Sequence, residues 1–341
     1  MSVTNKKPKL PRVVCFGGGT GTFVALKGLK NYPTHLSAIV TMSDSGGSNK
    51  RIRDEFGLLP TSDLRQCLVA LSDETGGVGL LRKLFMYRFE KGNGISGMTF
   101  GNLFMAALSD ILGSQQEAIR QTGKVLRIQG TVIPVSFTDT NLFAVYEDGH
   151  VLSEEHLIDE PPHDGTMKIT DVYLKPKATA NSEAVDAIAK ADMIVLGPGD
   201  LFTSLLPTVL VEGIPEAIRT SKATKVYVCN LMTKYGQTYG FTAKDHVETL
   251  QRYIGISPDY VVVNNAVVPD EALKHYATFH ENPVIDNLES TPVCTVVRAD
   301  VISGLFTEKS KSDTLVRSLI RHDSMKLASI LHDILIRKEK V

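Results

Sequence analysis

Four glycines in five positions follow a short apolar run near the beginning of the chain. The run 13–16 (Val-Val-Cys-Phe) leads into a glycine loop at 17–21, and residues 23–29 then have the spacing of an amphipathic helix. A strand, a glycine turn and a helix in this order point backbone N–H groups at an anion. Glycine also lets the backbone approach phosphate oxygens and take positive φ without a Cβ clash. The stretch predicts a phosphate-binding loop, with a tight turn that holds no ligand as the alternative.

The glycine spacing argues against two familiar cofactor loops. The dinucleotide fingerprint G-x-G-x-x-G requires a glycine where the chain has Thr22, and its other frame requires one where the chain has Thr20. The P-loop requires a Lys-Ser/Thr pair, which does not follow. The acid that holds an NAD ribose lies about 20 residues beyond the loop, whereas the first acid here is Asp44. Neither an NAD enzyme nor a P-loop NTPase is favoured, and phosphate binding remains.

Length and charge exclude several classes of protein. The chain has 341 residues, ample for a sizeable core. Its 37 basic and 38 acidic side chains balance, so nothing indicates a nucleic-acid-binding surface. No apolar run reaches the roughly 18 residues of a membrane span, and residues 1–9 are polar, without the apolar core of a signal peptide. We expect a cytoplasmic protein with a disordered tail over residues 1–9 and reduced thiols at Cys15, Cys67, Cys229 and Cys294.

Apolar strands alternate with helical segments along most of the chain. Strands are expected near residues 13, 37, 193, 226, 260 and 294, the pattern of an α/β, doubly wound fold with a mostly parallel, Rossmann-like sheet. Over residues 130–176 the pattern changes to period two, which predicts an antiparallel insertion. We expect residues 10–341 to form a single α/β domain that contains this insertion and ends in C-terminal helices. Asn181 and the capping box Thr242–Asp245 predict two helix starts.

Polar loops follow several of the predicted strands. The strand 36–42 leads into Ser43-Asp44-Ser45-Gly46-Gly47, and the strand 192–196 leads into Gly197-Pro198-Gly199 with Thr203 and Ser204. Asn230 and Asn264 end two more strands. Because ligands of open α/β sheets bind outside the carboxyl ends of the strands, we expect these loops to converge on one crevice. Asp44 is the candidate catalytic or metal-binding carboxylate there, and a polar turn is the alternative.

Three less specific features accompany these loops. Gly101 and Asn102 begin a predicted helix, where they either face an anion or cap the helix. The basic run 50–53 either neutralises a diphosphate or forms a solvated surface. The spacing of His150, His156 and His163 does not indicate a metal site, and we expect these side chains at the surface.

Eight groups of residues resemble the motifs of the CofD-like/YvcK family (UPF0052), in the order that the family has. They are 14–22, 41–48, 60–67, 100–102, 197–199 with Thr203 and Ser204, 229–230, 236–238 and 245–246. The resemblance covers residues 10–330 and is closest to the YvcK branch, the gluconeogenesis factors. It implies a cytoplasmic regulator that binds a UDP-sugar such as UDP-N-acetylglucosamine and is required for cell shape, cell-wall synthesis and growth on gluconeogenic carbon sources. The partners it implies are a second copy of the chain, a regulatory kinase and cell-wall enzymes.

The transferase branch of the same family implies an alternative function. That branch transfers 2-phospho-L-lactate onto the deazaflavin Fo with a metal held by carboxylates. On this alternative, Asp44 and Asp63 are catalytic and hold Mg²⁺. The chain departs from the transferase pattern, because Ser43-Asp44-Ser45 replaces paired aspartates and residues 60–63 (Pro-Thr-Ser-Asp) keep one aspartate of two. These departures argue against strong metal binding and against deazaflavin chemistry.

The resemblance also marks three residues near the C-terminus. It implies that Tyr276 stacks on or hydrogen-bonds the nucleotide, that Arg321 contacts the diphosphate, and that Ser324 is a phosphorylation site, where added charge would alter the region. Packing by Tyr276 and a solvated helix junction at 321–324 are the alternatives. The ligand-binding residues that we expect are Gly17, Gly18, Gly19, Thr20, Gly21, Thr22, Ser43, Asp44, Ser45, Gly46, Gly47, Arg65, Gly101, Asn102, Gly197, Pro198, Gly199, Thr203, Ser204, Asn230, Asn264, Tyr276 and Arg321.

Overall fold

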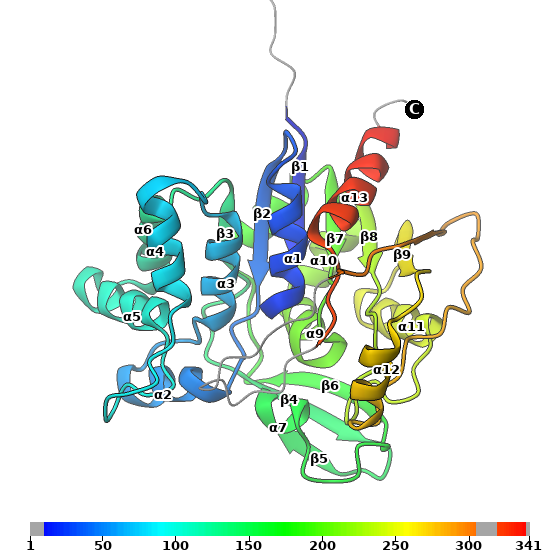
Figure 1. Cartoon of the computed structure of the whole chain (residues 1–341), viewed down its shortest axis with the longest axis horizontal. Helices are drawn as coiled ribbons and strands as arrows, with labels where there is room; N and C mark the ends of the chain where they lie inside the picture. The colour runs from blue at the N-terminus through cyan, green and yellow to red at the C-terminus, as the bar shows by residue number, and fades with distance from the viewer. Residues whose placement is uncertain (1–9, 305–318, 339–341) are drawn as a thin grey trace, which may run out of the picture.

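The computed structural model describes residues 10–304 and 319–338, so the expected tail at residues 1–9 lies outside the described residues. Within the described part, a seven-stranded sheet with the order β10-β9-β8-β7-β1-β2-β3 forms the centre of the molecule (Figure 1). All the pairings in this sheet are parallel. Its strands are β1 (Arg12–Phe16), β2 (His35–Val40), β3 (Thr131–Pro134), β7 (Met193–Leu196), β8 (Thr224–Val228), β9 (Tyr260–Asn264) and β10 (Thr295–Ala299).

The chain winds outward in both directions from the middle of this sheet. Strands β1, β2 and β3 succeed one another toward one edge, and β7 to β10 succeed one another toward the other. This arrangement confirms the predicted doubly wound, mostly parallel fold class. The winding reverses between β1 and β7, which are hydrogen-bonded neighbours. Folds of this kind bind their ligands at such a switch point, outside the carboxyl ends of the strands.

The side chains of β1 explain why helices cover both faces of the sheet. Val13 and Cys15 are buried in one apolar cluster, and Val14 and Phe16 in another. Because successive strand residues point to opposite faces, an unbroken apolar run requires cover on both sides. The first cluster includes α1 (Gly19–Leu29), α3 (Ser62–Leu71) and α13 (Ser324–Lys338). The second includes α8 (Ser182–Ala189), α9 (Leu206–Val209), α10 (Ile214–Thr220) and α11 (Ala243–Ile254).

The remaining helices flank the two edges of the sheet (Figure 1). They are α2 (Gly47–Phe56), α4 (Gly76–Met86), α5 (Phe100–Leu112), α6 (Gln115–Val125) and α12 (Asp270–Ala277). The π-helical turn η1 (Leu201–Leu205) precedes α9 and belongs to the second apolar cluster. Two predicted helix starts are confirmed, because the Asn181 side chain accepts a hydrogen bond from the backbone of Glu183 and both hydrogen bonds of the Thr242–Asp245 capping box are present. None of the described helices combines the length and the apolar character that crossing a bilayer requires.

A second, antiparallel sheet lies below the carboxyl ends of the main strands in Figure 1. It has the order β5-β4-β6 and consists of β4 (Asn141–Tyr146), β5 (Val151–Ser153) and β6 (Ile169–Lys175), with the short helix α7 (Glu155–Asp159) between β5 and β6. The predicted start of the insertion at residue 130 was wrong, since β3 pairs in parallel with β2 in the main sheet. Period-two apolar spacing is common to both kinds of edge strand and does not specify the partner.

Candidate functional site

A cavity of about 920 Å³ lies where the loops after β1, β2, β7 and β8 meet. Three of these loops, at 17–22, 43–48 and 197–204, were expected to converge, and each contributes lining residues. Helices α3, α7 and α12 and the segment 320–322 contribute further lining residues. The cavity therefore occupies the switch point between β1 and β7. Its volume lies in the range of small-molecule sites, which is roughly 300–1,000 Å³.

Helix α1 begins at the cavity without a side chain to cap it. Its N-cap is Gly18, and residues 18–21 line the cavity. The first four N–H groups of a helix have no partner inside the helix, and the helix dipole makes this end attractive to anions. Thr20, in this first turn, is one of the lining residues. The local backbone therefore has the arrangement that the glycine pattern predicts.

The glycines also permit close contacts between loops. A Cβ atom on Gly18 would lie 1.9 Å from Oδ2 of Asp63, and one on Gly21 would lie 2.1 Å from the carbonyl oxygen of Pro198. Gly17 has a φ of +133° and donates its N–H to the carbonyl of Ile39 at 3.2 Å. These glycines are required by the fold of the site as well as by any ligand.

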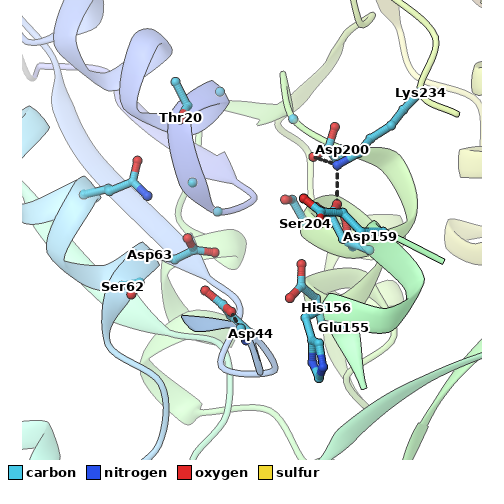
Figure 2. A pocket seen from close by; sticks show the side chains of 18 of the residues that line it. Thr20, Asp44, Ser62, Asp63, Glu155, His156, Asp159, Asp200, Ser204 and Lys234 are labelled. Carbon is cyan, nitrogen blue, oxygen red and sulfur yellow. Dashed lines mark hydrogen bonds and ion pairs between the residues drawn. The ribbon is translucent and has the colours of Figure 1, made fainter. Parts of the chain in front are cut away.

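Asp44 and Asp63 point into the same open space from one side of the cavity (Figure 2). Asp44 accepts a hydrogen bond from the backbone N–H of Gly46 at 2.9 Å and another from Nδ2 of Asn49 at 2.5 Å. Burial raises the pKa of Asp44 above its ordinary value, and the negative charge of Asp159 raises it further, while the Gly46 hydrogen bond opposes both.

A chain of hydrogen bonds connects Asp44 to Arg65. Asn49 accepts from the hydroxyl of Ser62 at 2.9 Å, and Asn102 donates to that hydroxyl at 3.0 Å. Arg65 in turn donates from Nε to Oδ1 of Asn102 at 3.0 Å. Asn102 is fully buried and does not line the cavity. Asn102 thus lies behind the lining, where its amide holds Ser62 and Arg65, and contact of Asn102 with a ligand stays a prediction.

The opposite side of the cavity carries charged residues that the sequence analysis did not select. Glu155, His156 and Asp159 come from α7, Asp200 from the loop after β7, and Lys234 from the loop after β8. Figure 2 shows Glu155 facing Asp44 and Asp63 across the open space. His156, which was expected at the surface, is half-buried: its side chain is 34% exposed, its Nδ1 lies 3.0 Å from the Ser45 hydroxyl, and the residue belongs to the cavity lining. The sequence around α7 has period-two apolar spacing and contains no motif that indicates a binding site.

These charges affect one another strongly. Burial raises the pKa of Glu155 well above its ordinary value, and the charges of Asp44 and Asp159 add to the effect. Burial also raises the pKa of Glu281 to about 7, with a smaller opposing effect of Lys234. Burial lowers the pKa of Lys234, but Asp159 and Asp200 outweigh it, so the net pKa is raised and the ammonium persists.

The metal prediction rests on Asp44 and Asp63, and both line the cavity. Residues 10–304 and 319–338 contain no group of three or more histidine, cysteine or acidic side chains arranged to hold a metal ion. Binding of Mg²⁺ by these two aspartates therefore stays a prediction, for which a ligand phosphate would have to supply further oxygens.

The C-terminal residues marked by the resemblance also reach the cavity. Tyr276 and Arg321 line it, and the Tyr276 hydroxyl accepts from the N–H of Ile320 at 3.1 Å. Tyr276 is only 4% exposed, so its side chain packs in the first apolar cluster and also lines the site. Within the described residues, the buried Oδ1 of Asn230 has no hydrogen-bond partner, although this residue lines the cavity. Ser324 begins α13 outside the lining.

Several predicted residues support the lining without belonging to it. The amide of Asn264, for example, bonds the backbone of Ala266 and Val301. The lining includes Gly18, Gly19, Thr20, Gly21, Asp44, Gly46, Asp63, Arg65, Pro198, Gly199, Thr203, Ser204, Asn230, Tyr276 and Arg321. Among the described side chains and glycines, it does not include Gly17, Thr22, Ser43, Ser45, Gly101, Asn102, Gly197 or Asn264. Gly47 is the first residue of α2.

The fold and the cavity define a doubly wound α/β protein with a ligand-sized site at its switch point. The chain belongs to the CofD family, because the family model described as 2-phospho-L-lactate transferase CofD matches residues 13–302. It is 39% identical to the gluconeogenesis factor of Bacillus subtilis, over 95% of this chain and 98% of that protein. It is 44% identical to the gluconeogenesis factor of Halalkalibacterium halodurans, over 81% of this chain and 84% of that protein.

A solved structure supports the same family. The crystal structure of a UPF0052 family member from Bacillus halodurans covers 96% of this chain and is itself covered completely, with a TM-score of 0.85 and 37% sequence identity. The predicted resemblance to the CofD-like/YvcK family is thereby confirmed over nearly the whole chain.

Proposed function

We propose that this protein is a regulator that binds a sugar nucleotide of the UDP-sugar class, such as UDP-N-acetylglucosamine. The observation that carries the proposal is the uncapped first turn of α1, which opens into a cavity of about 920 Å³ at the switch point of the sheet. A diphosphate would accept hydrogen bonds from the N–H groups of residues 18–21, and Arg321 would add positive charge. The Oδ1 of Asn230 would accept a hydrogen bond from the uracil or the sugar.

The names of the relatives support the physiological part of the proposal. Gluconeogenesis factors of two bacteria match this chain over most of its length. On this basis the protein would be required for growth on gluconeogenic carbon sources, and the binding of a cell-wall precursor nucleotide would connect that growth to cell shape. The protein would act in the cytoplasm as a homo-oligomer, with a kinase acting on Ser324 and with cell-wall enzymes as partners.

A second candidate is a transferase of a phosphorylated small group. It is favoured by the family model and by the two carboxylates, Asp44 and Asp63, that face the same space. With Mg²⁺ bound, these carboxylates would position a phosphate for displacement. The regulator is preferred because Asp44 is already held by Gly46 and Asn49, and because Ser43 and Ser45 flank Asp44 where the transferase pattern has paired aspartates.

Titration calorimetry of the full chain with UDP-N-acetylglucosamine, with and without Mg²⁺, tests the proposal. The regulator predicts binding in the micromolar range or tighter, which corresponds to about −8 kcal/mol, and no consumption of the nucleotide on prolonged incubation. Metal-dependent consumption that disappears in the Asp44→Asn and Asp63→Asn variants would instead establish the transferase. A chain that binds neither UDP nor UDP-N-acetylglucosamine would overturn both candidates.

A further inference from the structure

The wall of the cavity across from the glycine loop carries a charged network of its own. We call Asp159, Asp200, Glu155 and Lys234 together the acidic wall, because three of these four side chains carry carboxyl groups. Lys234 forms ion pairs with Asp159 and, at 3.4 Å, with Oδ2 of Asp200. Figure 2 shows the Lys234 ammonium between these two carboxylates, which lie on the side of the opening away from Asp44 and Asp63.

One oxygen of Asp159 holds this network together. Its Oδ1 accepts hydrogen bonds from Lys234, from Nε2 of Gln237 at 2.8 Å and from the hydroxyl of Thr203 at 3.3 Å. Gln237 and Thr203 are 2% and 3% exposed, so the Asp159 side chain is fixed from behind by buried groups. Its second oxygen, Oδ2, makes no hydrogen bond within the part of the chain that the structure describes. The acidic wall thus presents a fixed carboxylate oxygen to the cavity.

The charge of the acidic wall determines what it can bind. Three carboxyl groups surround one ammonium that is already paired, and Glu281 lies close enough to interact with both Lys234 and Asp200. Phosphate oxygens carry negative charge and accept hydrogen bonds, so this wall repels them. Hydroxyl groups, by contrast, donate to carboxylate oxygens and accept from an ammonium. A neutral group rich in hydroxyls fits the wall.

The position of the acidic wall connects it to the phosphate site. The backbone of Pro198 lies against Gly21 in the first turn of α1, and Asp200 follows two residues later. A diphosphate on the first turn of α1 would therefore place its next substituent beside Asp200 and Lys234. In a nucleoside diphosphate sugar, one substituent of the diphosphate is a hexose with several hydroxyls.

We propose that the acidic wall is the specificity site for the sugar of the bound nucleotide, with Asp159 and Asp200 as hydrogen-bond acceptors for its hydroxyl groups. This inference rests on the proposed function and adds the part of the cavity that distinguishes a UDP-sugar from UDP. The glycine loop binds both compounds through the diphosphate, and only the UDP-sugar reaches the acidic wall. The sugar therefore contributes affinity through groups that play no part in phosphate binding.

Calorimetry with UDP and with UDP-N-acetylglucosamine separates sugar binding at the acidic wall from binding of the nucleotide itself. The Asp159→Asn variant keeps an oxygen for Gln237 and Thr203 but loses the charge that receives a hydroxyl. In EDTA, so that no metal ion bridges ligand and protein, we expect it to weaken UDP-N-acetylglucosamine binding by about tenfold or more and to change UDP binding by less than about twofold. The matched control is Asp186→Asn, the same chemical change in an exposed pair with Lys190 on α8, which should alter neither affinity.

Each other outcome has a definite meaning. Equal weakening of both compounds, no weakening of either, or a wild-type protein that binds UDP as tightly as the UDP-sugar would overturn the acidic wall as the sugar site and leave nucleotide binding intact. A wild-type protein that binds neither compound would overturn the proposed function, and this inference with it. If Asp159→Asn unfolds, Asp200→Asn replaces it, because the Asp200 side chain is 40% exposed and tolerates substitution better.

Discussion

The backbone of Gly21 packs directly on the backbone of Pro198, so closely that a Cβ atom on Gly21 would lie 2.1 Å from the Pro198 carbonyl oxygen. This contact joins the first turn of α1 to the loop after β7, across the switch point of the sheet. The phosphate-facing turn and the beginning of the acidic wall are thus held in one rigid arrangement. The turn and the loop can approach each other this closely because residue 21 is a glycine, which has a hydrogen atom in place of a side chain.

Gly21→Ala should therefore destabilise the protein and weaken nucleotide binding together. Because the added methyl group meets backbone rather than a flexible side chain, we expect a loss of about 3 kcal/mol in the free energy of unfolding, measured by urea denaturation. The control is Gly77→Ala in α4, where nothing lies within 4 Å of the added atom. That change should stabilise the helix by about 0.5–1 kcal/mol. Equal stability of the two variants would contradict the packing argument.

Asn49 connects Asp44 to the beginning of α3, so its removal should be costly. It is 1% exposed and accepts from the N–H groups of Thr61 and Ser62, both at 3.2 Å, while donating to Asp44. Asn49→Ala leaves these two N–H groups without their acceptor, and we expect a loss of about 2–4 kcal/mol in chemical denaturation.

The Asn49→Asp variant tests the contact with Asp44 separately from the loss of the hydrogen-bond acceptor. It keeps an acceptor for the two N–H groups but sets a second carboxylate against Asp44. Two adjacent carboxylates raise each other's pKa, so the folded form binds a proton more tightly than the unfolded form. The stability deficit of Asn49→Asp relative to wild type should therefore shrink as the pH falls from 7 toward 5. A deficit that does not change with pH would argue against direct contact between the two side chains.

Asp44→Asn should leave the fold intact. The pKa of Asp44 is raised in the folded protein, so ionisation of its carboxyl group costs stability. This cost is absent below the unfolded pKa and is complete once the pH rises above the folded pKa. At pH 7 the substitution removes this cost but also removes one acceptor for Asn49. The two effects oppose each other, and we expect the melting temperature in calorimetry to stay within about 4 °C of wild type. A fall of about 10 °C or more would make Asp44 a structural residue.

Acid should destabilise the protein partly through His322. This ring is 8% exposed and donates from Nε2 to the carbonyl of Cys229 at 3.1 Å, and burial lowers its pKa from 6.5 to about 4. The unfolded chain therefore binds the proton more readily, so stability is complete above about pH 6.5 and decreases as the pH falls toward about 4. The decrease from this one group amounts to about 3 kcal/mol.

Comparison of two pH profiles isolates the contribution of His322. His322→Asn removes the titrating group, so its unfolding free energy should fall less steeply than that of wild type between pH 6.5 and 4. Subtraction of the two curves cancels the other titrating groups, provided that they lie far from the substitution. Parallel curves would show that the ring is protonated as easily in the folded protein as in the unfolded chain.

The local elements of this protein are determined by its sequence alone. The apolar run 13–16, the glycine loop 17–21 and the helix after it can be recognised because backbone freedom and side-chain periodicity are properties of neighbouring residues. The same holds for the Asn181 cap and the Thr242–Asp245 capping box. Strands that alternate with helices then lead to a parallel sheet, whose strand ends must meet at one edge, which made the convergence of three loops predictable.

Tertiary structure alone decided which side chains face one another across the cavity. Asp159 and Lys234 are 75 residues apart in the chain, and Ser45 and His156 are 111 apart. The period-two pattern around α7 is that of an ordinary solvated insertion, and the pairing of β3 with β2 cannot be told from it. Asn102 likewise has the sequence context of a ligand contact or a cap, yet in the structure it is buried and its side-chain oxygen accepts a hydrogen bond from Arg65. Periodicity specifies which face of an element is apolar, but contacts between distant segments depend on how those faces pack, and that information lies in no single stretch of the chain.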